Sequence, residues 1–161
     1  MKGKIVIADA STLIGLSRIG QLSLLKKLFG EVIIPRGVYD EVAVERKERS
    51  HVFKKSTYLI IKDVEDRVST DFLMASFGKG EAQVLALTKE KKADLILLDE
   101  KRARKTARRA GFKVMGILGI LVISKDKGFI PSVKPFIEEL NSQGFRFSEK
   151  VMKRTLKEAR E

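Results

Sequence analysis

With 161 residues, 43% of them hydrophobic, the chain can bury one core and needs no second domain. It has no cysteine, which excludes disulfides and thiolate metal sites, and no apolar run suggests a membrane span or a signal peptide, so we expect a cytoplasmic protein with no membrane partner. Thirty-three Lys and Arg against 21 Asp and Glu give a net charge of +12, which predicts binding to polyanions such as nucleic acid, unless the charge only solvates the surface.

The N-terminal stretch Lys4 to Thr12, KIVIADAST, predicts a strand that is buried on both faces and is followed by a helix. We expect Ser11 to cap this helix, which continues to Ile19. Asp9 ends the strand, and in open α/β sheets ligands bind at the carboxyl ends of the strands. Asp9 is therefore the first candidate for a functional site.

The next elements lead to a second acid. Residues 21–29 have the apolar spacing of a helix, and residues 31–34 form a short strand that Pro35 closes. In the helix that follows, Glu41 shares a face with two valines, so we expect its side chain to point partly inward. A carboxylate in that place is costly unless a positive group meets it.

The charge-dense segment 44–55 is expected to be an exposed helix end or loop. It contains the only histidine, His51, which has no partner at the spacing of a metal site or a catalytic pair. A short strand at 58–62 and a helix at 70–77 follow, and Gly78 to Gly80 then interrupt the pattern. The histidine is therefore not a site candidate.

A helix over residues 80–92 begins with Glu81 in its first turn. The helix macrodipole alone explains an acid there. However, Glu81 also shares its face with Val84 and Leu85, so it leans toward the apolar side. Glu81 is the third candidate.

The strand expected at residues 95–98, LILL, repeats the pattern of the first strand and ends in Asp99, which Glu100 follows. If the two strands lie side by side in a parallel sheet, Asp9 and Asp99 meet at the same edge. Asp99 is thus the fourth candidate, and Glu100 is an acid that could supplement or replace it.

The helix expected at residues 100–110 is strongly basic. Its charged side chains recur at helical spacing and form a stripe that starts beside Asp99. Such a stripe can hold a phosphate backbone next to the acids, although a solvated helix face is an equally good explanation for any one of these side chains. The stripe consists of Lys101, Arg104, Lys105 and Arg108.

The rest of the chain continues the alternation of strands and helices. A short strand at 113–115 is followed by helices at 117–127 and 131–143 and by an amphipathic tail at 148–161, for which packing on the body is the default. Short buried strands that alternate with helices predict an α/β layer fold with a central parallel sheet.

The candidate residues limit the chemistry. The sequence has no Ser/His/Asp set, no cysteine nucleophile, no Walker-type loop and no GxGxxG after the first strand, so covalent nucleophilic catalysis and a glycine-rich nucleotide site are poorly supported. Four acids remain: Asp9, Glu41, Glu81 and Asp99. Gathered in one cleft they would raise one another's pKa unless a divalent cation neutralised them, and hard oxygen ligands suit Mg²⁺ or Mn²⁺. Two such ions on a phosphodiester would activate water and stabilise the leaving oxygen.

The order of these acids resembles that of the PIN domain, a metal-dependent ribonuclease fold. The resemblance is carried by four motifs that span nearly the whole chain: IADAST, PRGVYDEV, GKGEAQVLAL and LILLDEKRARKTARRAG. It is strongest to a prokaryotic branch similar to the VapC-type toxins of toxin–antitoxin pairs.

The resemblance implies a three-layer α/β/α fold with a short central parallel sheet and C-terminal helices. Residues 1–161 would form one domain, with 131–161 as a helical C-terminal extension. It also implies that the four acids share one or two Mg²⁺ or Mn²⁺ ions, with Ser11 near the metal-bound water. A homodimer and an antitoxin partner are expected on the same ground.

These observations lead to the hypothesis of a metal-dependent endoribonuclease that cuts single-stranded or looped RNA, and the resemblance extends this hypothesis to the toxin of a toxin–antitoxin pair. The alternative is a catalytically inactive module of the same fold that binds RNA or protein. A phosphohydrolase that attacks phosphorus through the first acid of an Asp-x-Asp motif is disfavoured, because Ser11 stands at the second position.

Overall fold

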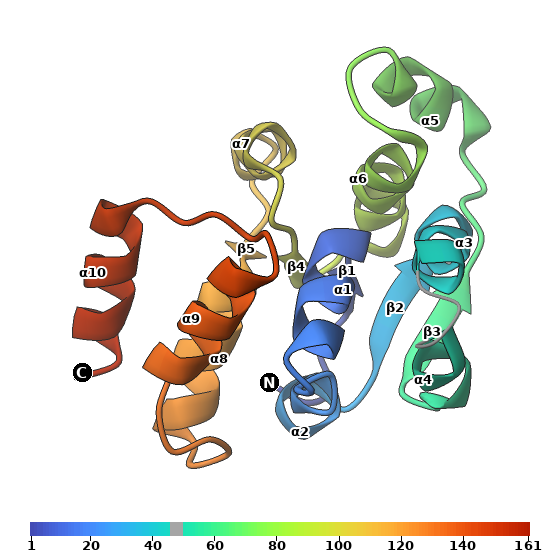
Figure 1. Cartoon of the computed structure of the whole chain (residues 1–161). Helices are drawn as coiled ribbons and strands as arrows, with labels where there is room; N and C mark the ends of the chain where they lie inside the picture. The colour runs from blue at the N-terminus through green and yellow to red at the C-terminus, as the bar shows by residue number, and fades with distance from the viewer. Residues whose placement is uncertain (46–49) are drawn as a thin grey trace.

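The computed structural model describes residues 1–45 and 50–161, and for residues 45, 50 and 51 it describes the backbone alone. Within this part of the chain, five parallel strands form one sheet in the order β3-β2-β1-β4-β5 (Figure 1). At the centre, Ile7 of β1 pairs with Ile33 of β2 and with Ile96 of β4. All five strands expected from the sequence are confirmed. They are β1 (Val6–Ala8), β2 (Val32–Pro35), β3 (Leu59–Lys62), β4 (Leu95–Leu97) and β5 (Val114–Met115).

Helices cover both faces of this sheet, which gives the expected three layers. Because crossovers between parallel strands are right-handed, α1 to α4 lie on one face and α5 to α7 on the other. Within these layers α1 packs on α3 and α8, and α6 packs on α5 and α7. The helices α3 and α6 also contact each other, and the backbone N–H of Gly37 donates to the side chain of Gln83 there. No helix among the described residues is long and apolar enough to cross a bilayer. The helices are α1 (Ala10–Arg18), α2 (Leu24–Phe29), α3 (Arg36–Glu45), α4 (Ser50–Lys55), α5 (Arg67–Met74), α6 (Lys79–Lys91), α7 (Lys101–Arg109), α8 (Ile117–Asp126), α9 (Lys134–Ser142) and α10 (Glu149–Glu158).

The core explains why the central strands read as unbroken apolar runs. Val6, Ile7 and Ala8 of β1 are all buried, as are Ile96 and Leu97 of β4, because helices cover both faces of these strands. The burial of both strands fixes their ends, so Asp9, directly after β1, and Asp99, two residues after β4, are placed at the same edge of the sheet. That edge carries the candidate site.

Two expectations about local structure are wrong. The cap of α1 is Asp9, not Ser11, because the Asp9 side chain accepts the backbone N–H of Thr12 while Ser11 is exposed. Part of the segment 44–55 lies outside the described residues, and its described remainder includes α4, whose Phe53 is buried in the core. Because most residues around it are charged, the burial of Phe53 is hard to predict from the sequence.

The C-terminal segment 131–161 is packed on the main body. Val133 and Leu140, at the start of α9 and within it, belong to the same core as the sheet. The last residue, Glu161, accepts the backbone N–H of Val133 at 2.7 Å and pairs with Lys125 of α8 at 3.1 Å. In Figure 1, α10 stands at one side of the molecule, beyond α8 and α9.

Candidate active site

Asp9 is held rigidly at the carboxyl end of β1. Its side chain is 2% exposed. One carboxylate oxygen accepts the backbone N–H of Thr12 at 2.9 Å, and the other accepts the backbone N–H of Asp99 at 3.0 Å. Because β1 and β4 are neighbours, this second bond joins residues that are 90 positions apart in the chain. The expected meeting of Asp9 and Asp99 is confirmed.

Asp99 is oriented by two further donors. Its Oδ1 accepts the backbone N–H of Ile117, the first residue of α8, at 3.1 Å. Its Oδ2 accepts the hydroxyl of Thr12 at 3.4 Å. A Cβ atom at Gly116 would lie 2.8 Å from this carboxylate, so only glycine leaves room for it at the start of α8. Each oxygen of both aspartates accepts one hydrogen bond and keeps a second lone pair.

Thr12 and Gly116 support the two aspartates, and neither residue is a site candidate from the sequence. Thr12 is fully buried and contacts both carboxylates, with its N–H on one and its hydroxyl on the other. Thr12 lies three residues after Asp9, which is where the backbone N–H that a helix-capping side chain accepts is found. This spacing is visible in the sequence. The contact with Asp99 depends on the pairing of β1 with β4, and no local pattern shows it.

The aspartates are difficult to ionise. Burial, and secondarily the charge of Asp99, raises the pKa of Asp9 to about 6. Burial also raises the pKa of Asp99. Among the ion pairs of the described residues, none includes either aspartate or Glu81. The pair therefore carries a desolvated negative charge without a directly bonded cation.

Glu81 stands in the first turn of α6 and is partly buried. Its carboxylate accepts the backbone N–H of Gly78 at 3.3 Å, so Glu81 also stabilises the start of α6, as an acid in the first turn of a helix commonly does. Burial raises the pKa of Glu81, and the negative charges of Glu100 and Asp9 add to the effect. Glu81 thus leans inward, as expected, and is coupled to Asp9.

Glu41 lies on α3 and is exposed, so the expectation that it points partly inward is wrong. It lies about 60° around the helix from Val38, which is enough to leave the buried face. Its carboxylate nevertheless borders the site, because a Cβ atom at Gly80 of α6 would lie 2.9 Å from Glu41 Oε2. The absence of a side chain at Gly80 lets this carboxylate approach the start of α6.

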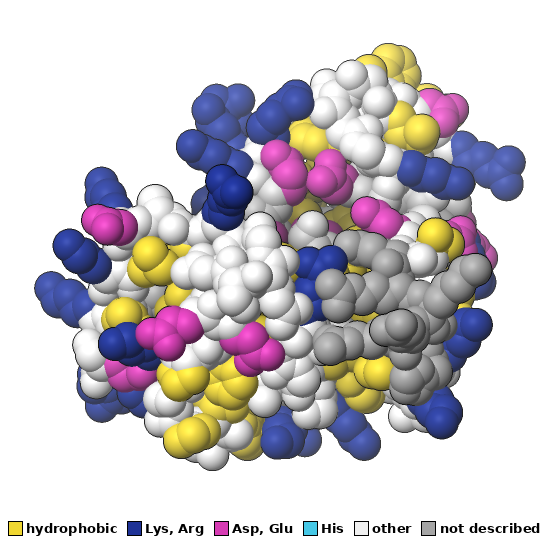
Figure 2. All heavy atoms as spheres, in the orientation of Figure 1, with side chains coloured by type: hydrophobic (Ala, Val, Ile, Leu, Met, Phe, Trp, Pro, Cys, Tyr) yellow, Lys and Arg dark blue, Asp and Glu magenta, His cyan; other side chains and the backbone are white. Residues whose placement is uncertain are grey.

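Three of the four acids line one cleft of about 370 Å³, which we call the acid cleft. The fourth, Asp99, is hydrogen-bonded to Asp9 as described above. Figure 2 shows acidic side chains gathered in the hollow between α7 and α6, with basic side chains crowded on the α7 side. The acid cleft is lined by Asp9, Ala10, Ser11, Gly37, Glu41, Gly78, Lys79, Gly80 and Glu81.

A PIN-domain family model matches residues 5–161. The chain belongs to the PIN-domain family. The match covers the sheet, every acid of the cleft and the C-terminal helices, and it confirms the resemblance noted from the sequence motifs. No curated protein sequence matches the chain. PIN domains are in general nucleases and typically use divalent metals.

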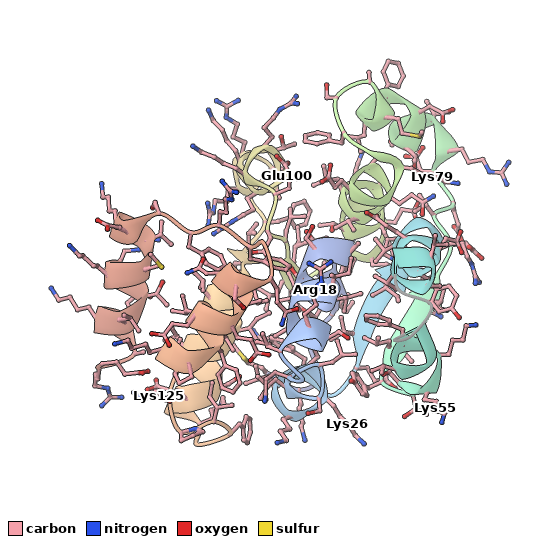
Figure 3. All side chains as sticks on the ribbon, in the orientation of Figure 1. Arg18, Lys26, Lys55, Lys79, Glu100 and Lys125 are labelled. Carbon is pink, nitrogen blue, oxygen red and sulfur yellow. The ribbon has the colours of Figure 1, made fainter. Side chains whose placement is uncertain are left out.

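Two of the other predicted residues have clear places in this PIN domain. Ser11 is exposed and lies where the acid cleft meets a second groove. Glu100 caps α7, because its two carboxylate oxygens accept the backbone N–H groups of Arg102 and Ala103 at 3.0 and 2.6 Å. Figure 3 labels Glu100 on the α7 side of the hollow and Lys79 at the start of α6. Each oxygen of Glu100 accepts one hydrogen bond from α7, so Glu100 has a structural role at the start of this helix.

The basic stripe of α7 is only partly a solvated face. Lys101, Lys105 and Arg108 are exposed. Arg104 is partly buried, and a Cβ atom at Gly116 would lie 3.3 Å from its guanidinium as well as 2.8 Å from Asp99. Arg104 thus faces the same small space as Asp99, while the other three project into the surroundings of α7.

The carboxylate oxygens of this PIN domain suit a divalent cation, but the four acids stand too far apart to bind one ion together. Carboxylate oxygens with free lone pairs are the ligands that Mg²⁺ and Mn²⁺ prefer. In the described residues, no three His, Cys, Asp or Glu side chains stand close enough to hold a metal ion together. Asp9 and Asp99 form the fixed part of the set, and Glu41 and Glu81 would have to turn about their side-chain bonds to join it. The unbalanced charge of the aspartate pair is the feature that a cation would relieve.

Proposed function

We propose that this PIN domain is an endoribonuclease that hydrolyses RNA phosphodiester bonds with Mg²⁺ or Mn²⁺ at the acid cleft. The observation that carries the proposal is the hydrogen-bonded aspartate pair at one edge of the sheet, where Asp9 is buried, Asp99 is partly buried and both have raised pKa values. Two glutamates lie beside this pair. A desolvated like-charge pair at the ligand edge of an α/β sheet is costly to the fold and points to a functional role.

Each residue has a distinct part in this proposal. Asp9 and Asp99 would hold one or two ions, and Thr12 would fix the direction of their oxygens. Glu41 and Glu81 would complete the ligand set. When bound, the metal supplies activation of water and stabilisation of the leaving oxygen. Ser11, at the exposed side of Asp9, is placed to hydrogen-bond water or substrate there.

The experiment is RNA cleavage by the purified chain with Mn²⁺, with Mg²⁺ and with a chelator. We expect cleavage with either metal, none with chelator, and a loss of about 100-fold or more in Asp9→Asn. A surface control such as Asp126→Asn, far from the acid cleft on α8, should cleave like the parent. Equal rates for the parent and Asp9→Asn would reject the proposal.

A catalytically inactive RNA-binding module is the second candidate, and one observation favours it: the described acids do not yet enclose a metal ion. This candidate predicts RNA retention that is sensitive to salt and survives both the chelator and Asp9→Asn. Metal-induced stabilisation separates the two, because a ligand that binds only the folded state raises its melting temperature.

The resemblance to toxins extends the proposal to an effect on growing cells. A toxin would stop growth when the parent chain is expressed and would not do so as Asp9→Asn. A protein antitoxin would restore growth by binding the chain. A homodimer is part of the same expectation, and light scattering of the purified chain measures it directly.

A further inference from the structure

A second groove of about 850 Å³ begins where the acid cleft ends. It runs between α7 and α10, with the residues 144–148 that precede α10 along its floor and wall. Ser11 borders both hollows, and Asp99 lies at the inner end of the groove. A chain that occupies the groove therefore leads directly to the aspartate pair.

The groove is basic on three segments of the chain. Five cations line it, against the acids Asp99, Glu100 and Glu158, and we call it the arginine groove. Glu100 is engaged in capping α7, and Glu158 lies on the same helix as Arg154, 3.8 Å from its guanidinium. By contrast, Lys79 is the one cation among the described residues that line the acid cleft on the other side of Ser11. The cations of the groove are Lys101, Arg104 and Arg108 on α7, Arg146, and Arg154 on α10.

Like charges converge in this groove from helices that are distant in the sequence. The guanidinium of Arg104 is partly desolvated, and the charges of Arg108 and Arg154 oppose its own charge, while the charges of Asp99 and Asp9 favour it. The buried Nε of Arg104 has no hydrogen-bond partner among the described residues. Three arginines that gather in one groove repel one another, and a phosphate with its several acceptor oxygens would relieve this repulsion.

The groove also has aromatic walls. Phe145 and Phe147 are partly buried and line it, and Phe145 is fixed between Gly15 of α1 and the guanidinium of Arg18, which lies 5.6 Å from the ring centroid. Basic grooves with aromatic rings are typical of sites for single-stranded nucleic acid, because unpaired bases can stack on the rings.

We infer that the arginine groove binds RNA phosphates on one side of the acid cleft, with α10 as the outer wall of the binding site. Arg104, Arg108 and Arg154 hold a phosphate next to the aspartate pair, so a residue of the C-terminal helix takes part in binding the substrate. This inference rests on the proposed function and adds the part played by α10.

The test measures binding apart from cleavage. The full chain, in chelator, is titrated against a fluorescent RNA of about twelve nucleotides, and anisotropy is followed across a series of salt concentrations. Arg154→Gln should weaken binding about fivefold at low salt. It should also reduce the slope of log affinity against log salt concentration by the amount that corresponds to about one phosphate contact. Glu158→Gln, which removes an acid from the groove, should strengthen binding.

The matched control is Lys153→Gln. It removes one positive charge from the same helix, at an exposed position that does not line the groove. We expect its affinity to stay within about twofold of the parent, since a distant surface charge contributes little. The side chain of Arg154 is 72% exposed, so Arg154→Gln should fold as well as the control, which thermal denaturation checks.

Equal weakening by Arg154→Gln and Lys153→Gln would overturn the inference. Its failure is separable from that of the nuclease proposal. If RNA binds through the groove but is never cleaved with Mn²⁺ or Mg²⁺, the groove inference stands and the nuclease proposal is rejected. If RNA is cleaved as the proposal expects but Arg154→Gln and Lys153→Gln bind equally well, the nuclease proposal stands and the groove inference is rejected.

Discussion

Thr12 is tied to Asp99 across the sheet: its hydroxyl donates to Asp99 Oδ2 at 3.4 Å, while its backbone N–H donates to Asp9. One buried residue thus sets the orientation of both aspartates. Its backbone bond is fixed by the start of α1, and its hydroxyl bond depends on the parallel pairing of β1 with β4. The two bonds can therefore be tested separately.

Thr12→Val removes the hydroxyl and preserves both the shape of the side chain and the N–H that Asp9 accepts. We expect cleavage to fall about tenfold, because Asp99 loses a donor that orients it, and stability to fall by about 1 kcal/mol. Thr12→Ser, which keeps the hydroxyl, should recover most of the rate. Cleavage assays with Mn²⁺ and thermal denaturation measure the two effects, and a valine variant with the parental rate would show that the bond does not matter.

The pH dependence of stability follows from the raised pKa of Asp9. In the folded chain this pKa is about 6, against 3.8 for an ordinary aspartate, so the folded state binds more protons between these values. Stability therefore decreases as the pH rises from about 4 to about 6, by up to about 3 kcal/mol for this one group. Asp99 and Glu81, which face Asp9 and also have raised pKa values, act in the same direction, while Arg104 opposes the change.

Melting temperatures in chelator between pH 4.5 and 7 measure this effect. The parent should lose stability across the range, and Asp9→Asn should lose less, because its residue 9 does not ionise. At pH 7, Mn²⁺ should raise the melting temperature of the parent and should not raise that of Asp9→Asn. A parent whose stability is flat or increases over this range would contradict the assignment of Asp9 as a protonated, desolvated group.

Much of this fold is visible in the sequence for local reasons. β1 and β4 are short apolar runs ended by an acid, and burial on both faces of a parallel sheet requires such runs. The same pattern marks Asp9 and Asp99 as residues at the ligand edge. The burial of Phe53 in α4 was not predicted, because charged residues dominate the segment around it.

The support of the site could not be predicted from the sequence, because it depends on contacts between distant segments. The hydroxyl of Thr12 meets a residue 87 positions away, and Gly116 matters only because the Asp99 carboxylate approaches the start of α8. The inward position expected for Glu41 was wrong because helical spacing gives an approximate angle, and a residue at the margin of the buried face can turn either way.

Gly80→Ala tests whether the position of Glu41 matters. The added Cβ would lie 2.9 Å from Glu41 Oε2, and its next contacts, with Val38, are ordinary ones at 3.6 Å and beyond. The flexible glutamate can move away, so the fold should not suffer, and alanine in a helix is favoured over glycine by about 0.5 to 1 kcal/mol. We expect a variant that is as stable as the parent or more stable, with cleavage reduced about tenfold.

The control is a double-mutant cycle with Glu41→Ala. If Gly80→Ala acts by displacing the Glu41 carboxylate, it should have no further effect on cleavage once that carboxylate is absent. Additive losses would show that Gly80 influences the acid cleft by some other route, such as a shift of Glu81 on the same helix.

Glu100→Gln distinguishes a helix cap from a fifth acid. The structure engages both oxygens of Glu100 with N–H groups of α7, and glutamine can offer only one oxygen to them. We therefore expect stability to fall by about 1 kcal/mol, as for the loss of a cap, while cleavage and the midpoint of a Mn²⁺ titration stay within about twofold of the parent. Asp99→Asn is the matched comparison, since it changes the adjacent acid and should abolish cleavage. A loss of metal affinity in Glu100→Gln comparable to that in Asp99→Asn would place Glu100 among the metal-binding acids, and the aspartate pair would then be only part of the negative charge that the cation must balance.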